Sequence, residues 1–426
     1  MPGGLALSIA RPGKVHGPVR AKLDWRMVRS RGPAGVSLTQ APACLSGAIM
    51  GRFLMDTLEK LKILSEDSQY DLACACGTGK TDRRRRGLDG KWLYPVTLPN
   101  GGYSVLLKTL LSNSCSNDCG YCPLRSDRDV RRCTLQPDET ARVFMDYVRQ
   151  GKVFGLFLSS GVIGDPDQTM ERINGVARIL RNKYRYRGYI HLKIIPGSSD
   201  AAVEDAISLA SAVSLNIEAP GRARFQSLSK KKDYMNGIIR PIKLMSRLTW
   251  RGYRYERVKC TTQFIVGASD ETDSEIIDYT FGIYRRLRFQ RVYFSAYQKG
   301  LGNPGIPGEN AALDPKERFM REHRLYQTDF LIRKYGFTRG DIILDKYGNL
   351  RLDKDPKEVW AESHPEFFPV RVNTSEKEAL LRVPGLGPET VLRIIKARME
   401  GRIIGLENLG LKGKRLERAL RYVICE

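Results

Sequence analysis

Three cysteines lie close together in the segment CSNDCGYC, which spans residues 115–122. Their spacing is Cys115-x3-Cys119-x2-Cys122. Thiols this close can be buried apolar side chains, part of a zinc site, part of a disulfide framework or ligands of an iron–sulfur cluster. The residues between the first two cysteines are Ser, Asn and Asp, and this polarity disfavours simple burial.

The chemistry of each metal narrows these alternatives. A cubane cluster takes four ligands, usually thiolates, so three cysteines on one loop leave one iron open for catalysis. A zinc site would need a fourth ligand nearby, and His191 is a distant candidate. Nine cysteines in 426 residues are too sparse for a disulfide scaffold. The pattern favours a cluster, with zinc as the alternative.

A repeated strand–helix pattern begins just before the cysteines. Strand-like runs lie at 103–112, 153–161, 189–197, 212–220, 260–268 and 291–297, and amphipathic helical stretches separate most of them. Such repeats predict an α/β fold with parallel strands and right-handed crossovers. The cysteines follow the carboxyl end of the first strand, where barrel folds carry their chemistry.

Polar residues recur on one face of these strands. Ile190, Leu192 and Ile194 alternate with His191 and Lys193, because neighbouring side chains of a strand point to opposite faces. Further polar residues on the inner face are Ser214, Asn216, Glu218 and Tyr293. A closed eight-stranded barrel fills its interior with branched apolar side chains. Six strands with a polar inner face therefore predict a partial (β/α)6 TIM-like barrel whose interior holds a ligand.

The overall charge constrains the partner. The chain has 71 Lys and Arg against 47 Asp and Glu, a formal net charge of +24. Such a surplus attracts polyanions and favours nucleic acid, although an acidic surface is an alternative. No apolar run reaches about 18 residues, so the sequence predicts no membrane span and a cytoplasmic location.

Composition also divides the chain. We expect a disordered extension or start-site artefact at 1–55, an N-terminal segment packing on the barrel at 56–100, the core barrel at 101–345, a linker at 346–374 and a separate C-terminal domain at 375–426. Met50 and Met55 are alternative starts, and a transit peptide is a minor alternative reading of the extension. The runs RRRR at 83–86 and KKK at 230–232 indicate solvated basic surface, with phosphate contact as the alternative.

The C-terminal segment contains two glycine-rich turns between short helices. The stretch LLRVPGLGPETVLRIIKAR (380–398) resembles the helix-hairpin-helix motif, and ENLGLKGKRLERALRYV (407–423) resembles a looser second copy. Glycine turns present bare N–H groups to phosphate oxygens, so we expect a small all-α nucleic-acid-binding domain. Its candidate contacts are Gly385, Gly387, Gly410, Lys412, Gly413, Lys414 and Arg415. A plain helical hairpin for packing or dimerisation is the alternative.

The cysteine segment resembles the CxxxCxxC loop of the radical S-adenosylmethionine enzymes, whose fold is a partial (β/α)6 barrel. The resemblance implies that Cys115, Cys119 and Cys122 hold a [4Fe–4S] cluster whose open iron binds S-adenosyl-L-methionine. It implies cofactor contacts from Tyr121, Ser159, Ser160, Gly161, Ser214, Asn216, Glu218 and Gly267. The SSG stretch lacks the acidic residue usual in the family's glycine-rich motif.

Some inner residues and cysteines have open alternatives. His191, Lys193 and Tyr293 are candidate catalytic residues that face the substrate, or else structural residues of the interior. Cys74 and Cys76 with Cys133 are candidates for an auxiliary cluster, or else small core residues. The other cysteines, Cys44, Cys260 and Cys425, are isolated.

Over residues 56–426 the chain resembles the DNA modification/repair radical SAM protein family. The stretches SSGVIGDPDQTMERI, SLNIEAP and REHRLYQTDFL carry this resemblance, which does not cover residues 1–55. It implies an enzyme that acts on DNA, an electron donor such as flavodoxin or ferredoxin, and an association with a uracil-DNA glycosylase-like protein. The alternatives are an RNA (tRNA)-modifying radical enzyme and a non-catalytic iron–sulfur DNA-binding protein.

Overall fold

A computed structural model describes residues 55–71, 93–97 and 103–426 of the chain. Leu54–Glu426 form one compact unit. The expected N-terminal extension, the arginine run at 83–86 and Cys44, Cys74 and Cys76 lie outside the described residues. Each helix within the described ranges is too short or too polar to cross a lipid bilayer.

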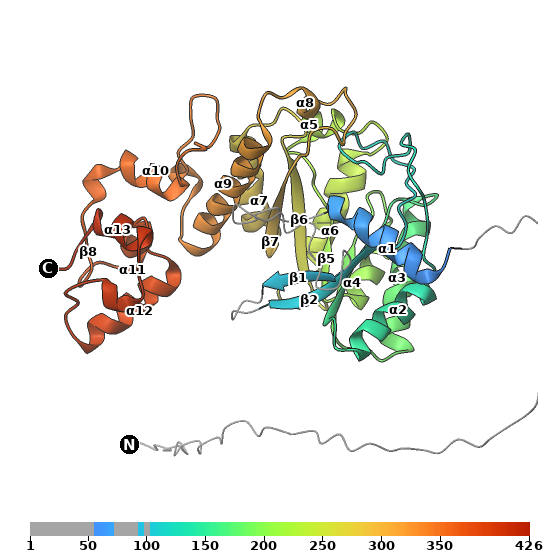
Figure 1. The fold of residues 1–426 in the computed structure, drawn as a ribbon, viewed down its shortest axis with the longest axis horizontal. Coiled ribbons are helices and arrows are strands. Elements are labelled where there is room, and N and C mark those ends of the chain that lie inside the picture. The colour runs from blue at the N-terminus through green and yellow to red at the C-terminus, as the bar shows by residue number, and fades with distance from the viewer. Residues whose placement is uncertain (1–54, 72–92, 98–102) are drawn as a thin grey trace, which may run out of the picture. The chain divides into compact units, whose positions relative to one another are not determined.

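A curled seven-stranded sheet forms the centre of the fold (Figure 1). Its strands lie side by side in chain order, with β2 to β7 parallel and β1 antiparallel to β2. They are β1 (Leu93–Thr97), β2 (Tyr103–Leu110), β3 (Gly155–Ser159), β4 (Tyr189–Lys193), β5 (Ala212–Ser214), β6 (Lys259–Val266) and β7 (Arg291–Ala296). The predicted α/β class and six parallel strands are confirmed, and β1 is an addition at the open edge.

Helices cover the outer face of this sheet (Figure 1). The main ones are α2 (Pro137–Arg149), α3 (Pro166–Asn182), α4 (Asp200–Leu209), α6 (Arg240–Leu248), α7 (Asp273–Leu287) and α9 (Pro315–Lys334). The shorter ones are α5 (Arg222–Gln226), the π-helix η3 (Tyr234–Ile239) and α8 (Pro307–Asn310). Several of these helices begin with an N-cap residue that accepts a hydrogen bond from a free backbone N–H group. Before α3, for example, the Asp165 carboxylate accepts from the Gln168 N–H at 2.8 Å.

Side chains alternate across the sheet as predicted. Leu107, Leu156 and Ile190 occupy one register row and are fully buried in the apolar core. The next row holds Phe157, whose ring lies 4.3 Å from the His191 ring and 4.9 Å from the Lys108 Nζ. The inner face is therefore polar and aromatic, unlike the apolar interior of a closed barrel.

The N-terminal helix α1 (Thr57–Asp67) and the following turn η1 (Ser68–Asp71) pack on β2. Leu61 and Leu64 are buried in the same core as the sheet. Lys60 of α1 pairs with Glu139 of α2 at 3.2 Å. This contact joins the N-terminal segment to the helix layer.

The C-terminal residues have their own apolar core, which includes Leu380, Val391 and Leu411. The elements after α9 are η4 (Arg339–Asp341), α10 (Pro356–Ser363), η5 (Pro365–Phe367), β8 (Val370–Arg371), α11 (Lys377–Arg382), α12 (Pro388–Glu400), η6 (Glu407–Leu409), α13 (Lys414–Leu420) and β9 (Val423–Ile424). Of these, α10 belongs to the main core, which includes Trp360 and Ala361, and the C-terminal core begins at Val370. The segment is not purely helical, because β9 pairs in parallel with β8 from the expected linker. A strand of two residues is too short to show as a periodic pattern in the sequence.

Candidate active site

The three clustered cysteines open onto one pocket at the carboxyl ends of the strands. Cys119 is buried, and Cys115 and Cys122 are half-buried. Other residues that line the pocket are Tyr121, Ser159, Ser160, Gly161, Lys193, Asn216, Glu218, Lys232 and Ile265. The fold therefore gathers most of the predicted cluster and cofactor residues from the carboxyl ends of three strands, β2, β3 and β5.

The side chains of Asp118 and Arg125 hold the cysteine loop in place. The Asp118 carboxylate accepts hydrogen bonds from Ser229 Oγ at 2.6 Å and from the backbone N–H of Lys230 at 3.0 Å. These bonds keep the pKa of Asp118 below its usual value, although partial burial opposes them. The buried Arg125 donates to the Cys122 carbonyl at 3.1 Å and to the Leu301 carbonyl at 3.2 Å.

Two glycines allow the backbone to approach this loop closely. A Cβ at Gly161 would lie 2.3 Å from the Ser114 carbonyl oxygen, just before Cys115. A Cβ at Gly120 would lie 2.4 Å from an Ile306 methyl carbon. Only glycine fits at either position without moving the loop. The SSG stretch thus has a steric reason for its glycine besides any contact with a cofactor.

A buried cation lies among the acidic and thiol groups of the pocket. The Lys232 Nζ is 4.0 Å from the Glu218 carboxylate, and both side chains are less than one-tenth exposed. Burial lowers the pKa of Lys232, but the Cys119 thiol and Glu218 outweigh it, so this pKa lies above its ordinary value. Burial raises the pKa of Cys119, which Lys232 partly offsets. Lys232 is thus part of the site and not of the solvated basic surface expected for residues 230–232.

Neighbouring groups complete this polar wall. The Asn216 Nδ2 donates to Glu218 at 3.4 Å, and both side chains are buried. Glu218 has a positive φ of 66°, and its backbone bridges to Phe264 of β6 beyond the end of β5. Burial and the nearby Glu218 carboxylate raise the pKa of Tyr121 well above its usual value. The Tyr121 phenol is therefore a neutral donor.

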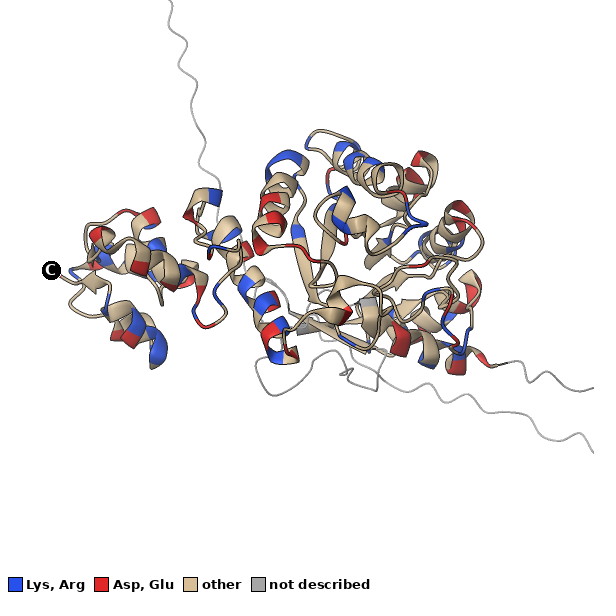
Figure 2. Ribbon diagram, turned by 90° about the horizontal axis from the view of Figure 1, so that it is seen from above, with Lys and Arg blue, Asp and Glu red and all other residues tan. Residues whose placement is uncertain are grey.

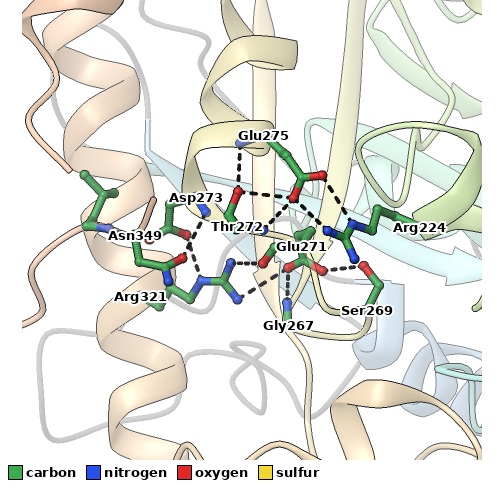
Figure 3. A network of polar contacts seen from close by, with 10 residues as sticks. Arg224, Gly267, Ser269, Glu271, Thr272, Asp273, Glu275, Arg321 and Asn349 are labelled. Carbon is green, nitrogen blue, oxygen red and sulfur yellow. Dashed lines mark hydrogen bonds and ion pairs between the residues drawn. The ribbon is translucent and has the colours of Figure 1, made fainter. Parts of the chain in front are cut away.

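The turn after β6 is fixed by a buried ion-pair network (Figure 3). Arg321 donates to Asp273 at 2.7 Å and lies 3.4 Å from Glu271. Glu271 in turn accepts from the Gly267 N–H at 2.6 Å. Gly267 has a φ of +80°, which other residues rarely adopt. The network holds this backbone turn beside Ile265 of the pocket.

Four predicted residues do not line the pocket, namely His191, Ser214, Tyr293 and Gly267. His191 Nε2 shares a hydrogen bond with Ser214 Oγ at 2.9 Å, and His191 Nδ1 shares one with the Tyr189 hydroxyl at 3.3 Å. These residues lie on the inner face of the sheet, below the pocket. Tyr293 lies next to Arg291, whose guanidinium carbon is 5.6 Å from its ring centroid. The fourth, Gly267, belongs to the network after β6. His191 is thus bonded elsewhere and is not a fourth ligand beside the cysteines.

The remaining described cysteines lie apart from this loop. Cys260 is buried against Thr249 Oγ1 at 3.2 Å, and burial raises its thiol pKa to about 11. Cys133 contacts the Lys60 carbonyl at 3.9 Å, while Cys425 belongs to the C-terminal core. The auxiliary cluster stays a prediction, because Cys74 and Cys76 lie outside the described residues.

The donor set fits an iron–sulfur cluster. Backbone N–H groups point at two of the thiols, with Val162 N at 3.4 Å from Cys115 Sγ and Leu124 N at 3.4 Å from Cys122 Sγ. Hydrogen bonds to sulfur are one of the ways in which proteins set cluster potentials. Within the described part of the chain, no three His, Cys, Asp or Glu side chains converge on a single metal ion.

Sequence reasoning missed Asp118, Arg125, Lys232 and Arg321 as supporting residues. Asp118 lies inside the cysteine segment, so the sequence does mark its carboxylate as a candidate for supporting that loop. The other three lie in charged stretches that resemble ordinary surface. Their burial depends on contacts between loops that are distant in sequence, which no local pattern reveals.

The chain matches no protein-family model and no curated protein. Solved structures that share features of the fold include the FeFe-hydrogenase maturase HydG from Carboxydothermus hydrogenoformans, at 14% identity and a TM-score of 0.42, over 53% of this chain and 51% of that one. Methylornithine synthase (PylB) matches at 14% identity and a TM-score of 0.40, over 64% of this chain and 74% of that one. The cobalamin-dependent S-adenosylmethionine radical enzyme OxsB matches at 11% identity and a TM-score of 0.36, over 79% and 64%. Likenesses this distant leave the function to be inferred from the site.

Proposed function

We propose that this chain is a radical S-adenosylmethionine enzyme that acts on nucleic acid, with DNA as the substrate. The observation that carries the proposal is the convergence of Cys115, Cys119 and Cys122 on one pocket at the carboxyl ends of parallel strands. The pocket also has a wall of buried polar groups, Asn216, Glu218 and Lys232. Three soft thiolates beside carboxylate, amide and ammonium groups suit a cluster with a bound amino acid moiety.

The residues of the pocket have distinct tasks in this proposal. A bound [4Fe–4S] cluster and S-adenosylmethionine would supply radical chemistry that removes a hydrogen atom from the substrate, with the electron for cofactor cleavage coming from an external donor such as flavodoxin or ferredoxin. The three cysteines bind the cluster, and the serines at 159–160 with Asn216 and Glu218 orient the cofactor's polar groups. Lys193 is the predicted catalytic residue that reaches the pocket, where it can contact the substrate.

Charge and the C-terminal turns support nucleic acid as the substrate. The net charge is +24, and Lys and Arg residues are spread along the barrel helices and the C-terminal helices (Figure 2). In the second glycine turn, Gly410, Lys412 and Gly413 are all exposed, as are Lys414 and Arg415. Exposed lysines and backbone N–H groups of this kind contact phosphates without reading sequence.

The first glycine turn is less open. Leu386 is buried, and its carbonyl accepts from the Lys357 Nζ at 2.7 Å. Gly385 has a φ of +88°, and a Cβ there would lie 2.4 Å from the Arg415 carbonyl oxygen. The first turn thus packs tightly against α13 and Lys357, so we assign the stronger phosphate contacts to the second.

Anaerobic reconstitution tests the radical chemistry. We expect the wild-type chain to bind about four irons and to form 5′-deoxyadenosine from S-adenosylmethionine and a reductant. Cys119→Ala should lose both properties, whereas Cys260→Ala, another buried cysteine, should keep them. Retention of iron and of 5′-deoxyadenosine formation by Cys119→Ala would refute the proposal.

The nucleic-acid substrate needs a separate comparison. We expect duplex or single-stranded DNA to stimulate cofactor cleavage more than tRNA does. Lys412→Gln/Lys414→Gln should weaken DNA binding while iron content stays at the wild-type level. A chain that cleaves the cofactor but prefers tRNA, or that binds no nucleic acid, would keep the radical chemistry and remove the DNA assignment.

A further inference from the structure

Exposed cations gather at the amino ends of β6 and β7. The connection from α6 to β6 carries Arg247 in the last turn of α6, Arg251, Arg254 and Arg257 in the loop, and Lys259 as the first residue of β6. The last turn of α7 adds Arg285 and Arg286, and the residue that caps this helix before β7 adds Arg288. All eight side chains are exposed, and together with Trp250 and Tyr253 they make up what we call the basic rim.

The charge of the basic rim is not neutralised by neighbouring acids. Among the described residues, none of its eight cations forms an ion pair, whereas arginines elsewhere, such as Arg178 and Arg333, are paired. The nearby acid Glu256 accepts from the Gly252 N–H at 2.8 Å. Glu204 accepts from the Tyr255 hydroxyl at 3.3 Å. An uncompensated cluster of this size favours an anionic ligand.

Two exposed aromatic rings lie among these cations. Trp250 is 39% exposed and Tyr253 is 55% exposed. The Tyr253 N–H donates to the Trp250 carbonyl at 3.0 Å, so one tight turn carries both rings. The Arg288 guanidinium carbon lies 5.8 Å from the Trp250 ring centroid, which links the loop before β6 to the turn before β7. Aromatic rings between arginines suit stacked bases with a phosphate backbone alongside.

The basic rim and the cysteine pocket lie at opposite ends of the same strands. Lys259 begins β6, and Ile265 lines the pocket near its other end. Eight strand residues rising about 3.3 Å each separate the two ends by roughly 23 Å. A ligand on the basic rim is therefore held apart from the reacting centre and is not the group that enters the pocket.

We propose that the basic rim is a second nucleic-acid-binding surface, and that its ligand is an unpaired strand. Arg251, Arg254 and Arg257 contact the phosphates, and Trp250 and Tyr253 stack against bases. Duplex DNA buries its base faces in its own stack, so rings that need a free base face select single strands. The inference stands on this surface alone and does not depend on the radical chemistry or on the C-terminal turns.

The composition of the rim favours nucleic acid over a membrane surface. Peripheral membrane helices insert a continuous apolar face below a cationic one. In the rim, the two exposed rings instead lie in the loop at 250–254, where they alternate with arginine and glycine, and its other cations come from helix ends and the start of β6. Arginine beside an aromatic ring matches a phosphate beside a base more closely than it matches lipid tails.

Binding of fluorescein-labelled oligo-dT of about 20 nucleotides to the full chain tests the proposal. The Arg251→Gln/Arg254→Gln/Arg257→Gln variant should bind more weakly, and the slope of log K against log salt should fall by about 2, since each phosphate contact in a single strand contributes about 0.7. Trp250→Ala/Tyr253→Ala should bind at least about fivefold more weakly with an unchanged slope. Quenching of tryptophan fluorescence by oligo-dT should disappear in Trp250→Phe.

A matched set of surface changes serves as the control. Arg142, Lys316 and Lys346 are also exposed, and Tyr347 is 69% exposed. Their replacement by Gln, with Tyr347→Ala, should leave affinity and salt slope at wild-type values. The rim defects should persist when Lys412 and Lys414 are also changed, because the two surfaces are separate. Wild-type affinity and slope in the rim variants, or a defect limited to phosphatidylserine vesicles, would overturn the proposal.

Discussion

At the carboxyl ends of the parallel strands, Arg321 and Lys232 are shielded from solvent and have acidic partners, whereas the eight cations of the basic rim, near the amino ends of β6 and β7, are exposed and form no ion pair with any described residue. Arg321 lies between Glu271 and Asp273, and Lys232 lies beside Glu218. The cations of the basic rim face solvent. Buried pairs hold a fixed geometry, which a cluster and cofactor need. Exposed cations stay available to a mobile polyanion.

The largest effect should follow from breaking a buried pair. Arg321→Met leaves the Glu271 and Asp273 carboxylates buried without their cation, and removal of one partner of such a pair costs about 3–5 kcal/mol. Urea unfolding monitored by circular dichroism measures the loss. Arg254→Met at the basic rim should change the free energy of unfolding by no more than about 0.5 kcal/mol. Equal losses in the two variants would contradict the contrast between the two ends.

A loss of comparable size should follow at the cysteine loop. Arg125→Met removes hydrogen bonds to the Cys122 and Leu301 carbonyls, and each bond between a charged group and a buried acceptor contributes about 1.5–3 kcal/mol. We expect a lower free energy of unfolding and less iron per chain after reconstitution, because the loop no longer keeps its shape. Arg128→Met is the matched control, since Arg128 is exposed on the same loop. Full iron content in Arg125→Met would show that the cysteines keep their positions without the hydrogen bonds from Arg125.

The sheet and the cysteines could be predicted because both have local signals. The six parallel strands have apolar alternation and the cysteines have a spacing, and the structure confirms the order of strands. The strand β1 contains Pro95 and pairs antiparallel at an edge, which no β-α repeat indicates. The placement of Lys232 and Arg321 could not be predicted either, because their partners lie on other loops.

Residues assigned to one face by alternation divide into two levels in the structure. Ser214, Asn216 and Glu218 alternate in sequence, but β5 ends at Ser214. Ser214 bonds His191 within the sheet, whereas Asn216 and Glu218 line the pocket. Period-two alternation gives the face of a strand and not the depth at which the strand ends. The division between cofactor and interior residues therefore required the structure.

Lys232 offers a test whose readout is the cluster itself and not the free energy of unfolding. Its ammonium group lies among Cys119 and Glu218, and a nearby cation stabilises the more negative, reduced state of a cluster. Lys232→Met should therefore lower the reduction potential by roughly tens of millivolts, as followed by electron paramagnetic resonance during a redox titration. Lys230→Met, two residues away and exposed, should leave the potential unchanged. An unchanged potential in Lys232→Met would assign the cation to packing alone.

The smallest effect on stability should come from the basic rim. Changing Arg251, Arg254 and Arg257 to Gln removes three exposed like charges that have no acidic partner among the described residues. We expect each change to alter the free energy of unfolding by no more than about 0.5 kcal/mol, with a net gain because repulsion among the eight cations falls. Since exposed charges are screened over about 10 Å at 0.1 M salt, the gain should disappear at high salt. A large loss of stability would mean that these arginines hold the loop together, and that their exposure does not mark a surface kept for a ligand.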